Sequence, residues 1–145
     1  MSNLEKYIRR DVLAPAEATQ PIADHIKAPC LELKSDQNYG DKNFRLGFVP
    51  VSKPYLMEEK PHKHDNDQFL LFIGGDLNNM LDLGGEVELT LSEDGKNFEK
   101  FVFTKATWVF VPRGLYHCPL FFKKINDPSK PILFNDFFFG DYRRV

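Results

Sequence analysis

The sequence has few cysteines, no long apolar run and no marked excess of charge of either sign. Two of its 145 residues are cysteine, Cys30 and Cys118, and their spacing matches neither a disulfide framework nor a CxxC metal site. We therefore expect buried thiols in a reducing compartment. No run reaches membrane-spanning length, and residues 1–7 lack the apolar core of a signal peptide, so we expect a cytoplasmic protein without a membrane partner.

The charge balance argues against a nucleic-acid partner. The formal net charge is −2, from 19 basic and 21 acidic residues scattered along the chain, and no basic stripe stands out. A chain of 145 residues can bury a core without disulfides or a structural metal, so one folded domain is expected. A small-molecule ligand or substrate is the expected partner.

Short β-type runs fill the chain from residue 40 onward, and many of the fourteen phenylalanines lie in them. The pattern predicts an all-β sandwich or barrel over residues 40–145. Residues 1–39 carry Pro15, Pro21 and Pro29, too close together for a long helix, and should form an irregular arm with a short helix near Leu4–Arg10. The expected strands are Phe44–Val51, Tyr55–His64, Phe69–Ile73, Glu86–Leu91, Phe98–Phe103, Thr107–Val111, Tyr116–Phe122 and Ile132–Phe139.

One turn is well specified by its residues. Ser92–Asn97 lies between two alternating apolar runs and contains Gly95. This pattern predicts a hairpin in which the glycine adopts a positive φ.

Histidines are concentrated in two places. In the stretch PHKHDNDQFLLFIGG, His62 and His64 are one residue apart, so on a strand they share a face and their side chains can chelate one ion. Gln68 has the same parity. His117 follows a strand and a Pro-x-Gly turn, whereas His25 in the arm has no companion. The predicted metal ligands are therefore His62, His64, Gln68 and His117.

These two places resemble the paired motifs of the cupin family. The first motif is resembled by an HxH pair that is followed after three residues by Gln and after six more by Gly; the family usually has Glu at the Gln position. The second motif is resembled by a PxG turn that is followed after two residues by His. The resemblance covers roughly residues 44–140 and implies a double-stranded β-helix, or jelly roll, with a metal ion inside the barrel. The residues that carry it are His62, His64, Gln68, Gly75, Pro112, Gly114 and His117.

The chain departs from the family pattern at several positions. Leu56 and Ala106 stand where the family has glycines, and Phe121 stands where an asparagine closes the second motif. Gln68 in place of Glu matters more, because three imidazoles and an amide leave a divalent ion with nearly its full charge. Such an ion should act as a Lewis acid on an anionic or enolisable substrate. Imidazole-rich sites accept zinc, iron, nickel, copper or manganese, so the metal is open.

Strand parity predicts the surroundings of the site. Leu70 and Phe72 should face inward with the first two histidines, and Leu115 and Phe121 should share the face of His117. Cys118 has the opposite parity and is expected to point away from the metal. The pocket would then be mainly apolar, as small-molecule sites are.

The remaining candidates could contact a substrate or transfer a proton. Glu58 and Tyr116 are the candidate catalytic groups, with Glu58 and Lys60 toward the barrel mouth, and Asp65 and Asp67 are expected in a solvated turn. The aromatic residues Phe134, Phe137, Phe138, Phe139 and Trp108 should pack in the core or at a subunit interface. The candidate substrate-binding residues are Arg113, Tyr116, Arg45 and Phe72.

We expect a metal-dependent cupin enzyme that acts on a small anionic or hydroxylated organic compound. One divalent transition metal ion (Zn, Fe, Ni or Mn) is the expected cofactor, and the neutral ligand set favours isomerase, lyase or ring-opening chemistry. An iron-dependent dioxygenase and a non-catalytic ligand-binding or sensing cupin are the alternatives, and a metal-free epimerase is disfavoured because it needs no paired histidines. The resemblance also implies a homodimer.

Overall fold

A computed structural model describes residues 3–8, 31–34 and 44–140, with side chains for all of these except 31–34 and 45. Within these ranges the chain forms one short 3-10 helix, η1 (Asn3–Tyr7), and nine strands. None of the helical structure described is long and apolar enough to cross a membrane. The strands are β1 (Leu31–Lys34), β2 (Phe44–Val51), β3 (Tyr55–Glu58), β4 (Gln68–Ile73), β5 (Asp82–Ser92), β6 (Glu99–Lys105), β7 (Thr107–Val111), β8 (Tyr116–Ile125) and β9 (Ile132–Phe139).

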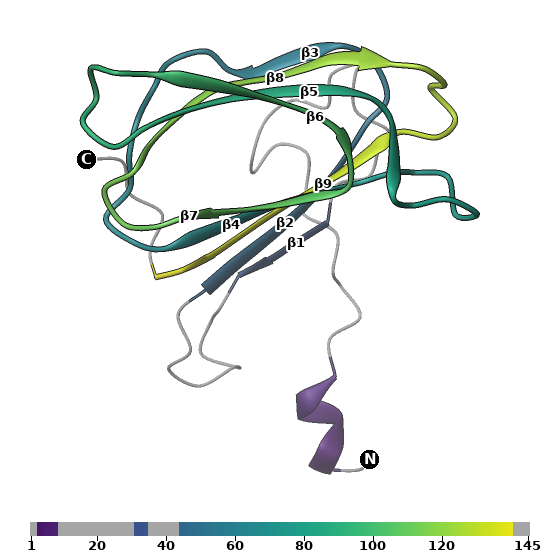
Figure 1. Ribbon diagram of the computed structural model, residues 1–145. Coiled ribbons are helices and arrows are strands. Elements are labelled where there is room, and N and C mark those ends of the chain that lie inside the picture. The colour runs from purple at the N-terminus through teal and green to yellow at the C-terminus, as the bar shows by residue number, and fades with distance from the viewer. Residues whose placement is uncertain (1–2, 9–30, 35–43, 141–145) are drawn as a thin grey trace.

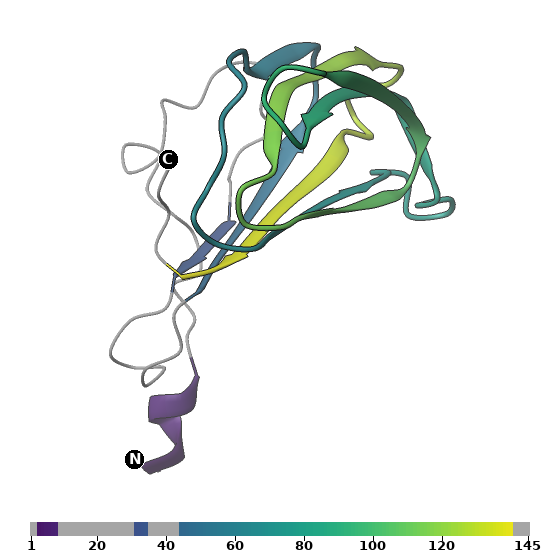
Figure 2. The same ribbon diagram turned by 60° about the vertical axis from the view of Figure 1, so that its left-hand side comes forward.

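The strands form two antiparallel sheets that face each other (Figure 1). One sheet has the order β1-β2-β9-β4-β7 and the other the order β3-β8-β5-β6. Since β9 lies between β2 and β4, strands distant in sequence are neighbours, and the chain crosses repeatedly from one sheet to the other. Figure 2 shows the same two layers turned by 60° about the vertical axis. This is a jelly roll, so the predicted all-β, cupin-type fold is confirmed.

The core is built from side chains that alternate into the space between the sheets. In β4 every second residue is buried, and Leu70 and Phe72 face inward as predicted. The Phe72 ring lies 5.1 Å from that of Phe134 and 6.0 Å from that of Phe122, between ring centroids. Burying each such ring stabilises the fold by about 1.5–3 kcal/mol, which makes this aromatic cluster the centre of the domain.

The predicted strand Tyr55–His64 is too long. Strand β3 ends at Glu58, and His62 and His64 lie beyond it in isolated bridges. Pro61 has no N–H to donate to the ladder of β8, and β3 is an edge strand from which the chain departs for the opposite sheet. The segment before β4 is therefore a crossing between sheets.

The N-terminal arm contains a strand that the sequence did not predict. Residues 31–34 form β1, which pairs antiparallel with β2 and extends the five-stranded sheet. The short helix expected near Leu4–Arg10 is present over Asn3–Tyr7. The predictions for residues 9–30, which include Cys30, lie outside the described residues.

A β-bulge in β8 changes the direction of its side chains. Leu89 pairs with Leu120 and Leu91 pairs with His117, so β8 has two residues where β5 has one. Cys118, the first of the two, has a φ of 85°. The extra residue reverses the parity, so the inward residues after the bulge are Leu120 and Phe122. The prediction that Phe121 shares the face of His117 is therefore wrong.

The hairpin predicted at Ser92–Asn97 connects β5 and β6, and its Gly95 has a φ of 72°. The carboxylate of Asp94 organises the turn, because it accepts backbone N–H bonds from Lys96 and Asn97, each at 2.8 Å. These bonds hold the pKa of Asp94 well below the usual range of a carboxyl group. The turn is thus organised by an ionised side chain at neutral pH.

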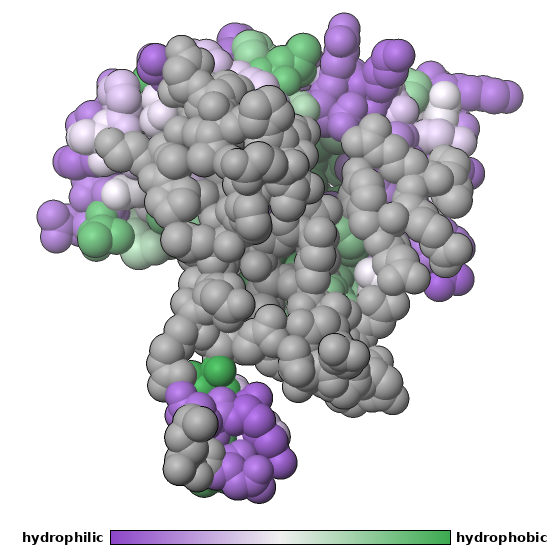
Figure 3. All heavy atoms as spheres, turned by 180° about the vertical axis from the view of Figure 1, so that it is seen from behind, coloured by the Kyte–Doolittle hydropathy of each residue, from purple (hydrophilic) through white to green (hydrophobic). Residues whose placement is uncertain are grey.

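The outer face of the four-stranded sheet is charged. Lys123 lies 3.2 Å from Glu88 and 3.7 Å from Glu86, and Lys100 lies 3.5 Å from Glu88. Figure 3 shows hydrophilic side chains on both sides of the upper edge of the molecule, where this sheet lies, with a hydrophobic patch between them. This face is therefore solvated.

The outer face of the five-stranded sheet carries aromatic side chains. Trp108, Phe110 and Phe139 are 65%, 52% and 51% exposed, whereas Phe134 and Phe138 are buried. The aromatic residues expected in a core or an interface are thus divided between the core and this exposed face. Exposed aromatic patches are typical of interaction surfaces, and the homodimer stays a prediction.

Candidate metal centre

Backbone hydrogen bonds lock the two histidine motifs together. The N–H of His62 donates to the carbonyl of His117 at 3.1 Å, and the N–H of His117 donates to that of His62 at 2.9 Å. The N–H of Gly114 donates to the carbonyl of His64 at 3.0 Å. Because these bonds belong to the backbone, the crossing segment before β4 and the start of β8 are held side by side whatever their side chains are.

The three predicted histidine ligands converge. The ring centroid of His62 lies 4.8 Å from that of His64 and 4.3 Å from that of His117, and those of His64 and His117 lie 4.9 Å apart. His64 and His117 are each 3% exposed. Three imidazoles thus share a small, largely buried volume, although His62 and His64 lie outside the strand on which they were expected.

Hydrogen bonds orient two of these rings. The Nδ1 of His62 lies 3.1 Å from the carbonyl of Lys60, and the Nδ1 of His117 lies 3.1 Å from the carbonyl of Leu115. A carbonyl only accepts, so in each neutral ring Nδ1 carries the proton and Nε2 keeps the lone pair. Metal-binding histidines are commonly oriented in this way. Both rings are therefore in the tautomer that coordinates through Nε2.

Gln68 begins β4 and is 4% exposed. Its Nε2 donates to Oδ1 of Asp136 at 2.7 Å, and its Oε1 is a buried side-chain atom with no hydrogen-bond partner among the described residues. Leaving an acceptor unsatisfied costs about 1–3 kcal/mol, which a cation or a donor would relieve. Gln68 pairs with Phe138, whose ring stacks 6.3 Å from that of His64. The residues present thus fit a divalent ion.

Asp136 is the polar residue of the site that the sequence analysis missed. It lies on β9 with the parity of the inward residues Phe134 and Phe138, and its carboxylate holds the amide of Gln68. The sequence contained a signal for it, because an acidic residue alternates with the inward phenylalanines of this strand. Its negative charge lies one hydrogen bond from the expected neutral ligand set, so the centre is less electropositive than its four predicted ligands imply.

We expect Asp136→Asn to weaken metal binding by about 10–100-fold, the usual effect of losing a partner that orients a ligand. The change removes the charge and allows the amide of Gln68 to turn over. A competition titration against a chromophoric chelator measures the affinity. Asp127→Asn removes the same charge at the other end of the barrel and should leave it unchanged. Equal metal affinities in the two variants would show that Asp136 does not orient a metal ligand.

Cys118 does not point away from the histidines, and the prediction that it would is wrong. The thiol is 4% exposed, and its Sγ and one ring nitrogen each of His62 and His117 all lie within 4.8 Å of one another. The bulge in β8 is the cause, because the conformation of Cys118 interrupts the strict alternation of the strand.

The candidate proton-transfer groups, Glu58 and Tyr116, lie in different surroundings. Glu58 is half-buried at the end of β3. Burial raises the pKa of the neighbouring Tyr55, and the charge of Glu58 raises it further, so Tyr55 is protonated at neutral pH. The ring of Tyr116 lies 5.0 Å from the ammonium of Lys63 and against the turn at Gly95. The structure therefore groups Tyr116 with Lys63 and the hairpin turn.

Two of the candidate substrate-binding residues, Arg113 and Phe72, lie in different environments. The side chain of Arg113 is 70% exposed and lies 3.6 Å from Asp65, and its backbone N–H donates to Asp67 at 3.0 Å. Both aspartates are thus exposed and contact Arg113 from a solvated turn, as expected. Phe72 is fully buried in the aromatic core. The backbone of Arg45 pairs with that of Phe138, and its side chain lies outside the described part of the molecule.

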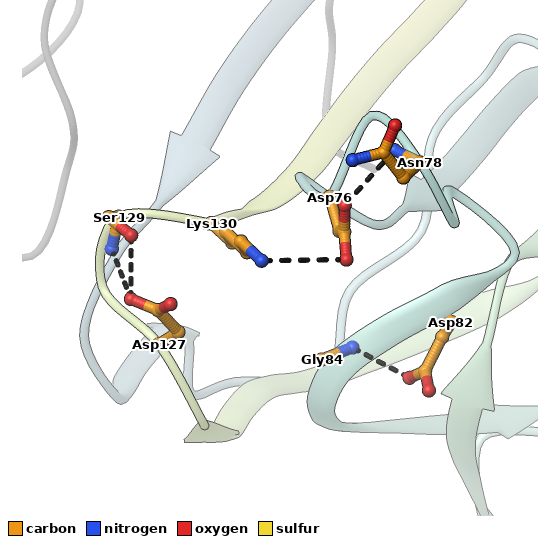
Figure 4. A network of polar contacts seen from close by, with 7 residues as sticks. All are labelled: Asp76, Asn78, Asp82, Gly84, Asp127, Ser129 and Lys130. Carbon is orange, nitrogen blue, oxygen red and sulfur yellow. Dashed lines mark hydrogen bonds and ion pairs between the residues drawn. The ribbon is translucent and has the colours of Figure 1, made fainter.

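A polar cleft lies at the opposite end of the barrel, between the loops that follow β4 and β8 (Figure 4). Its carboxylates form hydrogen bonds and an ion pair with residues of the surrounding loops and of β5. Asp127 accepts two bonds from Ser129, which lower its pKa, and Asp76 lies 3.6 Å from Lys130. Gly84 donates to Asp82 at 2.9 Å. The polar groups of this cleft therefore stabilise the two loops and join them through the ion pair of Asp76 and Lys130.

No protein-family model and no curated protein sequence matches the chain. Solved structures of oxalate decarboxylase from Bacillus subtilis share its fold. The structure of that enzyme at pH 4.6 has a TM-score of 0.53 and 17% identity, and the match covers 86% of this chain and 28% of the enzyme chain. A structure described by its Mn(II) centres has a TM-score of 0.50 and 11% identity, over 79% and 26%.

This chain therefore spans little more than a quarter of the length of these enzyme chains. At such low identity the similarity concerns the fold. Together with the two facing sheets and their strand order, it identifies the fold of this chain as a cupin-type double-stranded β-helix.

Proposed function

We propose that this protein is a metal-dependent cupin enzyme that acts on a small anionic or hydroxylated organic compound by non-redox chemistry. The observation that carries the proposal is the convergence of three imidazole rings, two of them oriented to coordinate through Nε2. The predicted ligands of one divalent transition metal ion are His62, His64, Gln68 and His117.

A divalent ion held by these ligands would supply Lewis acidity toward a substrate oxygen or a water molecule. The chain's own residues do the rest. Asp136 holds the amide of Gln68 so that Oε1 is presented and Nε2 is turned away. The buried ring of Phe138, which stacks 6.3 Å from that of His64, excludes water on that side and strengthens the electrostatic interactions within the site.

Lyase chemistry on a small carboxylate is the first reaction to test. The solved structures that share the fold are of an enzyme named for the decarboxylation of oxalate, and one is described by its Mn(II) centres. A carboxylate substrate also suits a cationic centre that is only partly neutralised by Asp136. Glu58, Tyr116 and a water molecule are the groups available to move a proton.

The test is an activity screen of the full chain loaded separately with Mn(II), Fe(II), Co(II) or Zn(II). Oxalate, other dicarboxylates, keto acids and sugar acids are the substrates, product is followed by NMR, and dissolved oxygen is recorded. We expect metal-dependent turnover without stoichiometric oxygen uptake, abolished in His64→Ala. Uptake of one oxygen molecule per turnover would instead assign a dioxygenase. Ligand binding without turnover under every metal would assign a binding module.

A further inference from the structure

The thiol of Cys118 is placed among the metal-binding candidates by the bulge in β8. It is 4% exposed, and its Sγ lies within 4.8 Å of one ring nitrogen of His62 and one of His117. Cys118 also has a φ of 85°, and in the described chain it is the one residue other than glycine with a positive φ. Such strained conformations are concentrated at functional sites, which makes the position worth a functional explanation.

We propose that Cys118 supplies a thiolate ligand to the ion held by His62 and His117, so that the centre has mixed nitrogen and sulfur donors. This inference rests on the proposed function, because it assumes that the histidine cluster holds a metal. It goes further by adding a ligand outside the predicted set and by naming the class of metal that the set prefers.

The distances are compatible with one ion. Donor atoms on a tetrahedral ion with Zn–N and Zn–S bonds of ordinary length are about 3.3–3.6 Å apart. The three donors of this chain are within 4.8 Å, so a shift of roughly 1 Å, within the reach of a side-chain rotation, brings them to bonding geometry. The backbone pair between His62 and His117 keeps their two rings in register while the thiol closes on the ion.

A thiolate changes which metal the site prefers. Soft sulfur ligands favour zinc, cobalt, iron and copper, whereas manganese and magnesium prefer oxygen ligands. Binding through sulfur also releases the thiol proton. We therefore expect this centre to discriminate against manganese, the metal named for one of the structures that share its fold.

Cobalt(II) spectroscopy on the full chain tests the inference directly. A thiolate bound to Co(II) gives an intense charge-transfer absorption in the near ultraviolet, and nitrogen ligands alone give weaker visible bands. The chain has two cysteines, so Cys30→Ser leaves Cys118 as the one thiol that could produce the charge-transfer band. We expect the band in the wild type and in Cys30→Ser and its loss in Cys118→Ser, with zinc affinity lowered at least about tenfold.

The outcomes separate the inference from the function on which it rests. Visible Co(II) bands without the charge-transfer band in Cys30→Ser would overturn the thiolate ligand and leave the histidine site standing. Failure of the wild type to bind Co(II) at all would overturn both. The result does not depend on Cys118→Ser folding, because the Cys30→Ser protein alone decides whether Cys118 is bound.

Discussion

The double variant His62→Ala, His117→Ala is expected to lose its transition metal, from near one ion per chain to near zero. These two rings belong both to the histidine cluster and to the group that includes Cys118, so their removal takes two donors from every candidate ligand set. The fold should survive, because the two segments are joined by backbone bonds that alanine retains. Elemental analysis of untagged protein measures the loss.

The chain offers a matched control for this variant. His25→Ala removes the fourth histidine, which belongs to neither motif, and should leave the metal content unchanged. Circular dichroism of all three proteins checks the fold. Retention of the metal in the double variant would place it elsewhere, and the enzyme proposal would lose its basis. The identity of the metal in the wild type then directs the substrate screen toward oxygen chemistry or Lewis-acid chemistry.

The substitution Phe72→Ala is expected to lower the free energy of unfolding by about 3–5 kcal/mol, the cost of truncating a fully buried aromatic ring. The ring has 0% exposure and lies 5.8 Å from Phe103, 6.0 Å from Phe122 and 5.1 Å from Phe134, between ring centroids. Truncation removes contacts on several sides, and the two sheets prevent full collapse of the cavity. Urea unfolding followed by fluorescence measures the change.

Phe110→Ala is the matched control, because the Phe110 ring is 52% exposed on the outer face. Its effect should be small, within about 0.5 kcal/mol for a surface site. The pair also tests the predicted role of Phe72 in substrate binding. A change of less than about 1 kcal/mol in Phe72→Ala, with loss of substrate affinity, would assign Phe72 to a pocket wall and contradict the packing role.

Local patterns were sufficient to predict most strands. The runs Phe44–Val51, Thr107–Val111 and Ile132–Phe139 have the same bounds in the sequence analysis and in the structure. In each, β-branched and aromatic residues favour an extended backbone, and turn residues or prolines mark the ends. The positive φ of Gly95 was predictable for the same reason, since the requirement is met within a few residues.

The strand β1 was not predictable from such patterns. Residues 31–34 are a four-residue edge strand, preceded by closely spaced prolines, and their pairing partner β2 begins only after a further nine residues. Short edge strands carry little periodicity of their own, because their stability comes from the neighbouring strand. The tertiary structure therefore decides whether such a segment is extended.

The sequence by itself determined the residue types of the candidate centre and their spacing. His62, His64, Gln68 and His117 were identifiable because the two motifs are short and their order along the chain is sufficient to pair them. What they contact depends on β9, which is more than sixty residues from Gln68 and becomes its neighbour only in the folded sheet. Asp136 enters the site through that pairing.

Only the tertiary structure decided the place of Cys118. Strict alternation along β8 predicts that it points away from His117, and one extra residue in the ladder reverses the prediction. A bulge arises from the register between two strands and leaves no clear pattern in either. Composition and spacing thus determined the fold class and three converging imidazoles, whereas strand pairing decided the acidic and thiol groups beside them, because those contacts depend on residues far apart in the chain.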